Sequence, residues 1–137
     1  MSEDQLKALL QYRMQQANET LHEADILFNQ SAYRGTINRA YYAMFYSVLA
    51  LLATRKLGTS KHSGVIGLFD REFVKTGLFP RDLSRSLRLT FDRRQTHDYG
   101  ELIEIDEQIA QETLNDAKVF ISTVDSYLHS TGHFKVL

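Results

Sequence analysis

Almost nothing in this sequence interrupts a helix. Pro80 is the only proline, and few of the seven glycines fall inside the long apolar patterns. Because proline and glycine are the residues that break or weaken helices, helix is the structure expected for most of the chain. No segment shows a convincing alternation of period two, which a half-buried strand would require. The sequence therefore predicts an all-α fold.

Apolar residues recur at three- and four-residue steps in five segments, as they do on one face of an amphipathic helix. The predicted helices cover residues 3–29, 32–56, 61–75, 81–97 and 105–129. The second has the widest apolar face, so we expect it to be the central helix. Gly58 is expected to adopt the left-handed conformation after its end, and Ser60 to cap the third helix. Short connections favour antiparallel neighbours, which predicts an up-and-down bundle of about five helices with a four-helix core.

Length and composition restrict the class of protein. A chain of 137 residues is expected to form one domain, 1–137, in which residues 130–137 are a frayed tail. Without cysteine there is no disulfide and no thiolate metal site, and the five histidines are scattered, so neither a metal nor a cofactor is expected. The N-terminus does not resemble a signal peptide, and the most apolar stretch, residues 40–53, is shorter than the roughly 20 residues of a membrane span. We therefore expect a soluble, cytoplasmic protein.

The charge balance excludes nucleic-acid binding through bulk charge. Sixteen basic and seventeen acidic residues give a net charge of −1. A protein that binds nucleic acid through its overall charge is strongly basic. Any such binding here must come from a local patch.

Two short segments combine polar and aromatic residues near predicted helices. Asn38 and Arg39 precede a tyrosine-rich face on the second helix, where the polar groups either form a binding groove or hydrogen-bond within the bundle. Lys61 and His62 stand at the start of the third helix, where backbone N–H groups attract anions. The alternative for this second segment is a capping turn with two solvated side chains.

A third segment concentrates reactive residue types at the end of the fourth helix: Arg93, Arg94, His97, Asp98 and Tyr99. On a continuous helix Arg94 and Asp98 face each other across one turn, and an exposed ion pair is one reading of them. The other reading is a phosphate site, because a guanidinium offers a planar fork of donors to a phosphate. His97 is the residue of this cluster whose unperturbed pKa suits proton transfer near neutrality.

Taken together, these segments resemble the small stand-alone members of the HEPN (higher eukaryotes and prokaryotes nucleotide-binding) family. The run from Tyr33 to Phe45 resembles the second-helix signature, residues 61–64 with the apolar residues that follow resemble the next segment, and residues 94–99 resemble an Arg-x-x-x-Asp-Tyr element. The resemblance covers about residues 6–128, nearly the whole chain.

The resemblance implies a homodimeric helical bundle, encoded beside a minimal nucleotidyltransferase in a toxin–antitoxin-type pair. It also implies that Asn38, Arg39, Arg93, Lys61 and His62 are candidates to bind a nucleotide or an RNA phosphate. The leading interpretation is therefore a partner protein of a nucleotidyltransferase with a polar groove. The alternatives are a metal-independent endoribonuclease toxin and a structural helical adaptor without a ligand.

The ribonucleases of the family carry Arg-x4-6-His, and here that motif is not intact. Measured from Arg94, His97 follows after two intervening residues, and Asp98 stands near where the histidine is expected. Arg94, Asp98 and His97 are the catalytic candidates, although an aspartate beside an arginine is a poor general acid at neutral pH. In family members paired with a nucleotidyltransferase, a tyrosine just after the motif accepts nucleotidyl groups, which makes Tyr99 the candidate acceptor.

Overall fold

A computed structural model describes the backbone of residues 1–98 and 105–133 and the side chains of residues 1–95 and 105–133. Within those ranges the chain contains helices and no strand, which confirms the all-α prediction. The elements are α1 (Glu3–Asn29), α2 (Tyr33–Thr54), α3 (His62–Phe69), the π-helical turn η1 (Asp70–Val74), α4 (Arg81–Asp98) and α5 (Glu107–Ser130).

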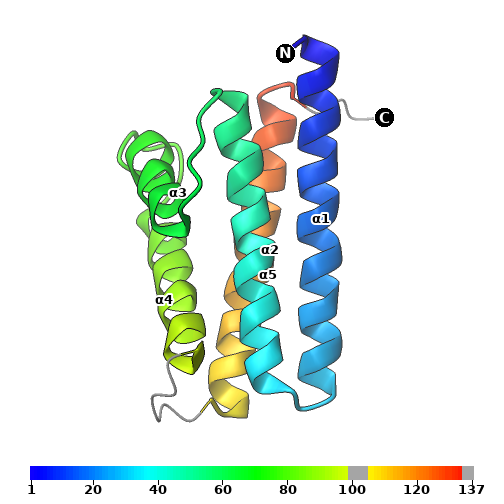
Figure 1. The fold of residues 1–137 in the computed structure, drawn as a ribbon, viewed down its shortest axis with the longest axis vertical. Coiled ribbons are helices and arrows are strands. Elements are labelled where there is room, and N and C mark those ends of the chain that lie inside the picture. Colours follow the sequence, from blue (N-terminus) through cyan, green and yellow to red (C-terminus); the bar gives the residue numbers. More distant parts are fainter. Residues whose placement is uncertain (99–104, 134–137) are drawn as a thin grey trace.

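The helices form a bundle with α2 at its centre. In Figure 1, α2 lies in front of α5, with α1 on one side and the α3–α4 pair on the other. The central helix packs against α1, α3, α4 and α5. Its sequence explains this position, because apolar or small residues occupy nearly all of its circumference. The prediction of a central second helix is thus confirmed.

The core is rich in aromatic rings. The rings of Phe69, Phe73, Phe79 and Phe120 pack against one another where α3, η1, α5 and the turn before α4 meet. The largest fully buried side chains of the described residues are Tyr41, Phe69, Phe73, Phe120, Leu10, Ile37, Met44, Leu51, Leu52, Leu87, Leu114 and Leu128. Tyr41 is the one large polar side chain in this set, and its hydroxyl requires a partner.

Two predicted helix signals prove wrong. The residue with positive φ after α2 is Lys56, at 57°, and not Gly58, because α2 ends at Thr54 and its C-cap is Arg55. The N-cap of α3 is Lys61, and no side chain caps that helix, so Ser60 is not the cap. By contrast Gly77, at the predicted turn before α4, does adopt positive φ, at 83°.

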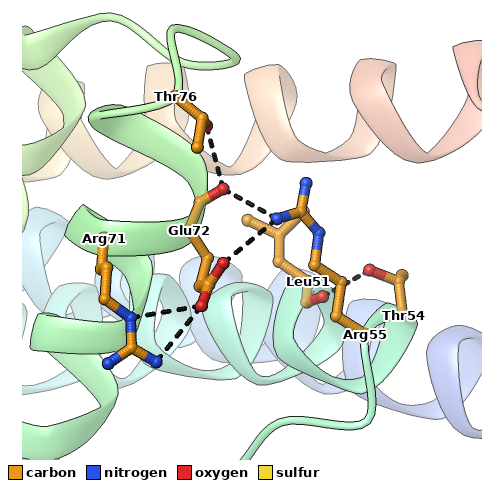
Figure 2. A network of polar contacts seen from close by, with 6 residues as sticks. All are labelled: Leu51, Thr54, Arg55, Arg71, Glu72 and Thr76. Carbon is orange, nitrogen blue, oxygen red and sulfur yellow. Dashed lines mark hydrogen bonds and ion pairs between the residues drawn. The ribbon is translucent and has the colours of Figure 1, made fainter.

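The segment predicted as the third helix is helical over nearly its whole length, but it changes from an α-helix to a π-helix part-way along. From Asp70 the chain forms a π-helical turn, which the Lys75 amide closes by donating to the Asp70 carbonyl at 2.8 Å. Arg55 from the end of α2 holds this turn (Figure 2). Its Nη1 donates to the Glu72 carbonyl at 2.9 Å and lies 3.5 Å from the Glu72 carboxylate, and its guanidinium stands 4.4 Å from the centre of the Phe73 ring. These contacts of Arg55 hold α3 and η1 against α2.

The last described helix, α5, ends at Ser130. Residues 134–137 lie outside the described part, so the frayed tail expected for residues 130–137 stays a prediction. No described helix combines the length and the apolar character needed to cross a membrane.

Candidate functional site

Arg94 is the centre of a cluster of aromatic and polar side chains between α2 and α4. Its guanidinium carbon lies 4.8 Å from the ring centre of Tyr41, 5.3 Å from that of Tyr42 and 5.8 Å from that of Phe91. Its Nη1 donates to the Tyr42 hydroxyl at 3.1 Å, and its buried Nε has no hydrogen-bond partner. Three aromatic rings thus contact this cation and help to hold it in place.

His62 approaches the same two tyrosines from the start of α3. Its Nδ1 lies 2.9 Å from the Tyr41 hydroxyl, and its ring lies nearly parallel to that of Phe45 at 4.3 Å. The Tyr42 ring meets it edge-on at 5.9 Å. The connection before α3 is tight, because a Cβ on Gly64 would come within 2.7 Å of the Thr59 side chain. The absence of a side chain at Gly64 therefore lets this connection pack closely beside the histidine.

Burial and Arg94 change the acid–base properties of this pair. Burial raises the pKa of Tyr41 well above its ordinary value. Burial also lowers the pKa of His62, and the positive charge of Arg94 lowers it further. Tyr41 therefore keeps its proton, and His62 tends to remain neutral near physiological pH.

Asn38 and Arg39 lie one turn along α2 from the tyrosines. The Asn38 Oδ1 accepts bonds from Arg39 Nε at 3.1 Å and from Nη2 at 2.9 Å. The Arg39 guanidinium lies 5.2 Å from the ring centre of Tyr42, so Arg39 and Arg94 both contact this ring. Arg39 thus approaches Arg94 through the ring of Tyr42, and Asn38 lines a small depression together with Arg94.

Arg93 and Arg94 point to different partners. Arg93 reaches α5, where its Nη1 donates to Thr113 at 2.8 Å and its Nη2 lies 3.5 Å from the Glu112 carboxylate. Nearby on α5, burial raises the pKa of Asp116, against the opposing charge of Arg93. A small depression beside the two arginines is lined by Arg34, Ile37, Asn38, Arg93, Arg94 and Ile105.

The remaining predicted residues are placed as follows. Lys61 is exposed at the N-cap of α3, next to the clustered His62. His97 and Asp98 belong to α4, but their side chains lie outside the described residues, as does Tyr99 entirely. The predicted Arg94–Asp98 pairing and the acceptor role of Tyr99 thus stay predictions.

Sequence reasoning missed that Arg34 lines the depression and that the tyrosine rings support the Arg94 cation. A signal was present, because Arg34, Asn38 and Tyr42 are spaced four residues apart and so share one face of α2. The contact of His62 with this face had no such signal, since residues 41 and 62 belong to different helices. No group of His, Asp and Glu in the described part of the chain has the arrangement of a metal site.

Comparison with known proteins places this fold in a family. The HEPN domain model matches residues 10–127. This chain belongs to the HEPN domain family.

Individual relatives are similar over most of their length. The chain is 38% identical over 120 residues to a UPF0332 protein of Thermotoga maritima, covering 88% of this chain and 91% of the relative. It is also similar to two proteins of Methanocaldococcus jannaschii named "Putative toxin MJ0142" and "Putative toxin MJ0605". The first is 34% identical, covering 94% of this chain and 88% of the relative, and the second 33% identical, covering 91% and 90%.

The HEPN match includes every element of the cluster around Arg94. Residues 10–127 contain α2, α3 and α4 whole, and with them Asn38, Tyr41, His62 and Arg94. The similarity to the T. maritima and M. jannaschii proteins likewise extends over most of each chain, so the chain is a small HEPN protein like these relatives.

Proposed function

We propose that this HEPN protein is the partner of a minimal nucleotidyltransferase in a toxin–antitoxin-type pair, and that it binds a phosphate of RNA or of a nucleotide at Arg94. The observation that carries the proposal is a guanidinium held by three aromatic rings and by the Tyr42 hydroxyl. These contacts orient the cation. A phosphate oxygen is the natural acceptor for its other N–H donors.

The distribution of charge supports an anionic ligand. Residues 55–95 contain ten Lys and Arg against four Asp and Glu, although the whole chain has a net charge of −1. This segment includes α3, η1 and most of α4, so the local positive charge coincides with the elements that carry His62 and Arg94. This excess of positive charge supports the binding of an anion to these elements.

Binding to a fluorescein-labelled single-stranded RNA and to ATP tests the proposal. Arg94→Met keeps an apolar side chain against the tyrosines and removes the charge, so we expect binding to weaken about ten- to a hundredfold, the effect of losing a charge-assisted hydrogen bond. Lys118→Met on α5 removes the same charge from an exposed pair with Asp25 and serves as the control. Failure of the wild-type protein to bind either ligand would favour the structural adaptor instead.

A second candidate is metal-independent cleavage of RNA. The observation that favours it is the presence of His62 in the same cluster as Arg94, which brings a histidine and an arginine together despite the departure from the Arg-x4-6-His spacing. Incubation of the same RNA with pure protein in a chelator tests this activity. Cleavage that disappears in both Arg94→Met and His62→Gln would support the ribonuclease, and an intact RNA would reject it.

The proposed partnership makes a separate prediction for Tyr99. Tyr99 follows Arg93 and Arg94 within six residues, so a nucleotidyl group on this tyrosine would add a phosphate to a basic stretch of the sequence. Mass spectrometry after incubation with the nucleotidyltransferase and ATP is expected to find the nucleotide on the peptide that contains Tyr99. Tyr99→Phe is the control for the site, and an unmodified wild-type peptide would contradict the prediction.

A further inference from the structure

The hydrogen bond between Tyr41 and His62 has a defined direction. Tyr41 is fully buried, and a buried hydroxyl proton without an acceptor costs free energy. Within the described residues the hydrogen-bond partner of this hydroxyl is His62 Nδ1, at 2.9 Å. Because burial keeps the hydroxyl protonated, the hydroxyl donates and Nδ1 accepts. A neutral imidazole that accepts at Nδ1 carries its proton at Nε2.

The surroundings of His62 oppose a second proton on the ring. Protonation of Nδ1 would turn an acceptor into a donor that faces the Tyr41 hydroxyl, whose own proton would then lack an acceptor. Among the described side chains, the titratable or charged groups that face His62 from other elements are Tyr41 and Tyr42 on α2 and Arg94 on α4, and its neighbour in the chain is Lys61. The charged ones are cations, so an imidazolium here would meet repulsion and no described counter-charge.

Arg94 and His62 both lie beside the rings of Tyr41 and Tyr42. The ring centre of Tyr41 lies 4.8 Å from the Arg94 guanidinium and 5.8 Å from the His62 ring, and that of Tyr42 lies 5.3 Å and 5.9 Å from them. The tyrosine pair therefore sets the positions of a cation and of an imidazole at once. Phe45 stacks against the imidazole and restricts its rotation.

We propose that Tyr41 is a positioning residue that holds His62 as the neutral Nε2–H tautomer, so that His62 offers a hydrogen-bond donor to a phosphate and no proton acceptor. This inference rests on the proposed phosphate-binding function. A general base needs an unoccupied lone pair, and the lone-pair nitrogen of His62 is engaged by Tyr41. His62 thus binds a phosphate group of RNA or of a nucleotide through its N–H donor and does not remove a proton from a ribose hydroxyl.

The tautomer is measured directly on the wild-type protein without ligand. Two-bond ¹H–¹⁵N correlation spectra of protein labelled at histidine nitrogen distinguish a protonated from an unprotonated ring nitrogen. We expect the His62 Nε2 to be protonated and Nδ1 unprotonated at pH 7. His62→Gln identifies the signals, and the exposed His22 on α1 provides a reference in the same spectrum. An Nδ1–H tautomer or an imidazolium would overturn the inference.

Inorganic phosphate and Tyr41→Phe complete the test. An anion beside His62 favours its protonated form, so added phosphate is expected to raise the pKa of His62 and to leave the His22 signals unchanged. In Tyr41→Phe both tautomers are expected, with affinity for phosphate reduced about two- to tenfold, the effect of one hydrogen bond. Tyr12→Phe, which changes an exposed tyrosine of α1, is the matched control. If phosphate does not change the His62 signals, the ligand assignment fails even with the tautomer as expected. If Tyr41→Phe keeps the wild-type tautomer, the positioning role fails even when phosphate binds.

Discussion

The Tyr42 ring is where the cluster around Arg94 comes together. Arg39 and Arg94 lie 5.2 Å and 5.3 Å from its centre, and its hydroxyl accepts a bond from Arg94. A guanidinium is weakly hydrated and planar, so it packs on an aromatic face at small cost while it keeps N–H donors for another partner. A lysine at position 94 would have neither the planar contact nor the fork of donors.

Because His62 is neutral in the folded protein, we predict that it affects how stability depends on pH. The pKa of His62 is lowered in the folded protein, so the unfolded chain takes up this proton first as the pH falls. The contribution of His62 to stability is therefore present above the unfolded pKa of about 6.5 and decreases as the pH falls through it toward the folded pKa. We expect the decrease in Tm between pH 7.5 and pH 5.5 to be smaller in His62→Gln than in the wild type, measured by circular dichroism.

The exposed His22 supplies the control for this experiment. His22→Gln makes the same change on the solvent-facing side of α1, so its Tm should follow the wild-type curve. An equal acid dependence in the wild type and in His62→Gln would contradict a lowered pKa at His62.

At the scale of elements, helix geometry separates the roles of neighbouring arginines. Consecutive residues on an α-helix differ by about 100° around its axis. Arg93 consequently reaches Thr113 and Glu112 on α5, whereas Arg94 lies on the tyrosines of α2. α4 thus uses adjacent positions to contact two different helices.

The π-helical turn η1 is held to α4 through one carboxylate. Asp70 accepts bonds from the Ser84 hydroxyl and from Arg88, and its side chain is 15% exposed. Asp70→Asn removes the charge from both contacts, and we expect it to lower the free energy of unfolding by about 1–2 kcal/mol. Chemical denaturation monitored by circular dichroism measures the change.

The matched control for Asp70 is Asp82 on the same helix hairpin. Asp82 pairs with Arg85 at 3.5 Å, and both side chains are exposed, at 82% and 78%. A fully exposed pair contributes little, so Asp82→Asn should change stability by less than about 0.5 kcal/mol. Equal effects of the two substitutions would show that the contacts of Asp70 do not stabilise the junction of η1 and α4.

At the scale of the whole molecule, the proposed homodimer needs an exposed apolar contact surface. The tyrosines of α2 offer little of it, because Tyr41 is fully buried and Tyr42 and Tyr46 are half-buried beneath other helices. Exposed apolar side chains lie instead on α1, where Tyr12 and Ile26 are 58% and 48% exposed. These two residues are fourteen positions apart and so share one face of α1.

The dimer is predicted from the family resemblance and is measured by multi-angle light scattering. We expect the mass of two chains over a range of protein concentrations, and a smaller mass for Ile26→Glu if the shared face of α1 forms the contact. Ser122→Glu introduces the same charge on the exposed surface of α5 and serves as the control. A mass of one chain at every concentration would contradict the prediction.

The sequence by itself determined the helices and their rough limits. Apolar periodicity is a local property, so it located α1, α2, α4 and α5 to within two residues at nearly every end and singled out α2 as the central helix. It did not determine the helix caps or the π-helical turn, because these depend on contacts such as that of Arg55 with Glu72, which join residues 17 positions apart.

The tertiary structure decided which polar residues form the candidate site. Asn38, Arg94 and His62 each stood out locally, but only the packing of α2, α3 and α4 brings Arg94 and His62 onto the Tyr41 and Tyr42 rings. The same packing turned Arg93 toward α5 and buried the Tyr41 hydroxyl against His62. The physical reason is that a contact between helices depends on their relative rotation and height, which hydrophobic burial across the whole bundle fixes and which no local pattern records.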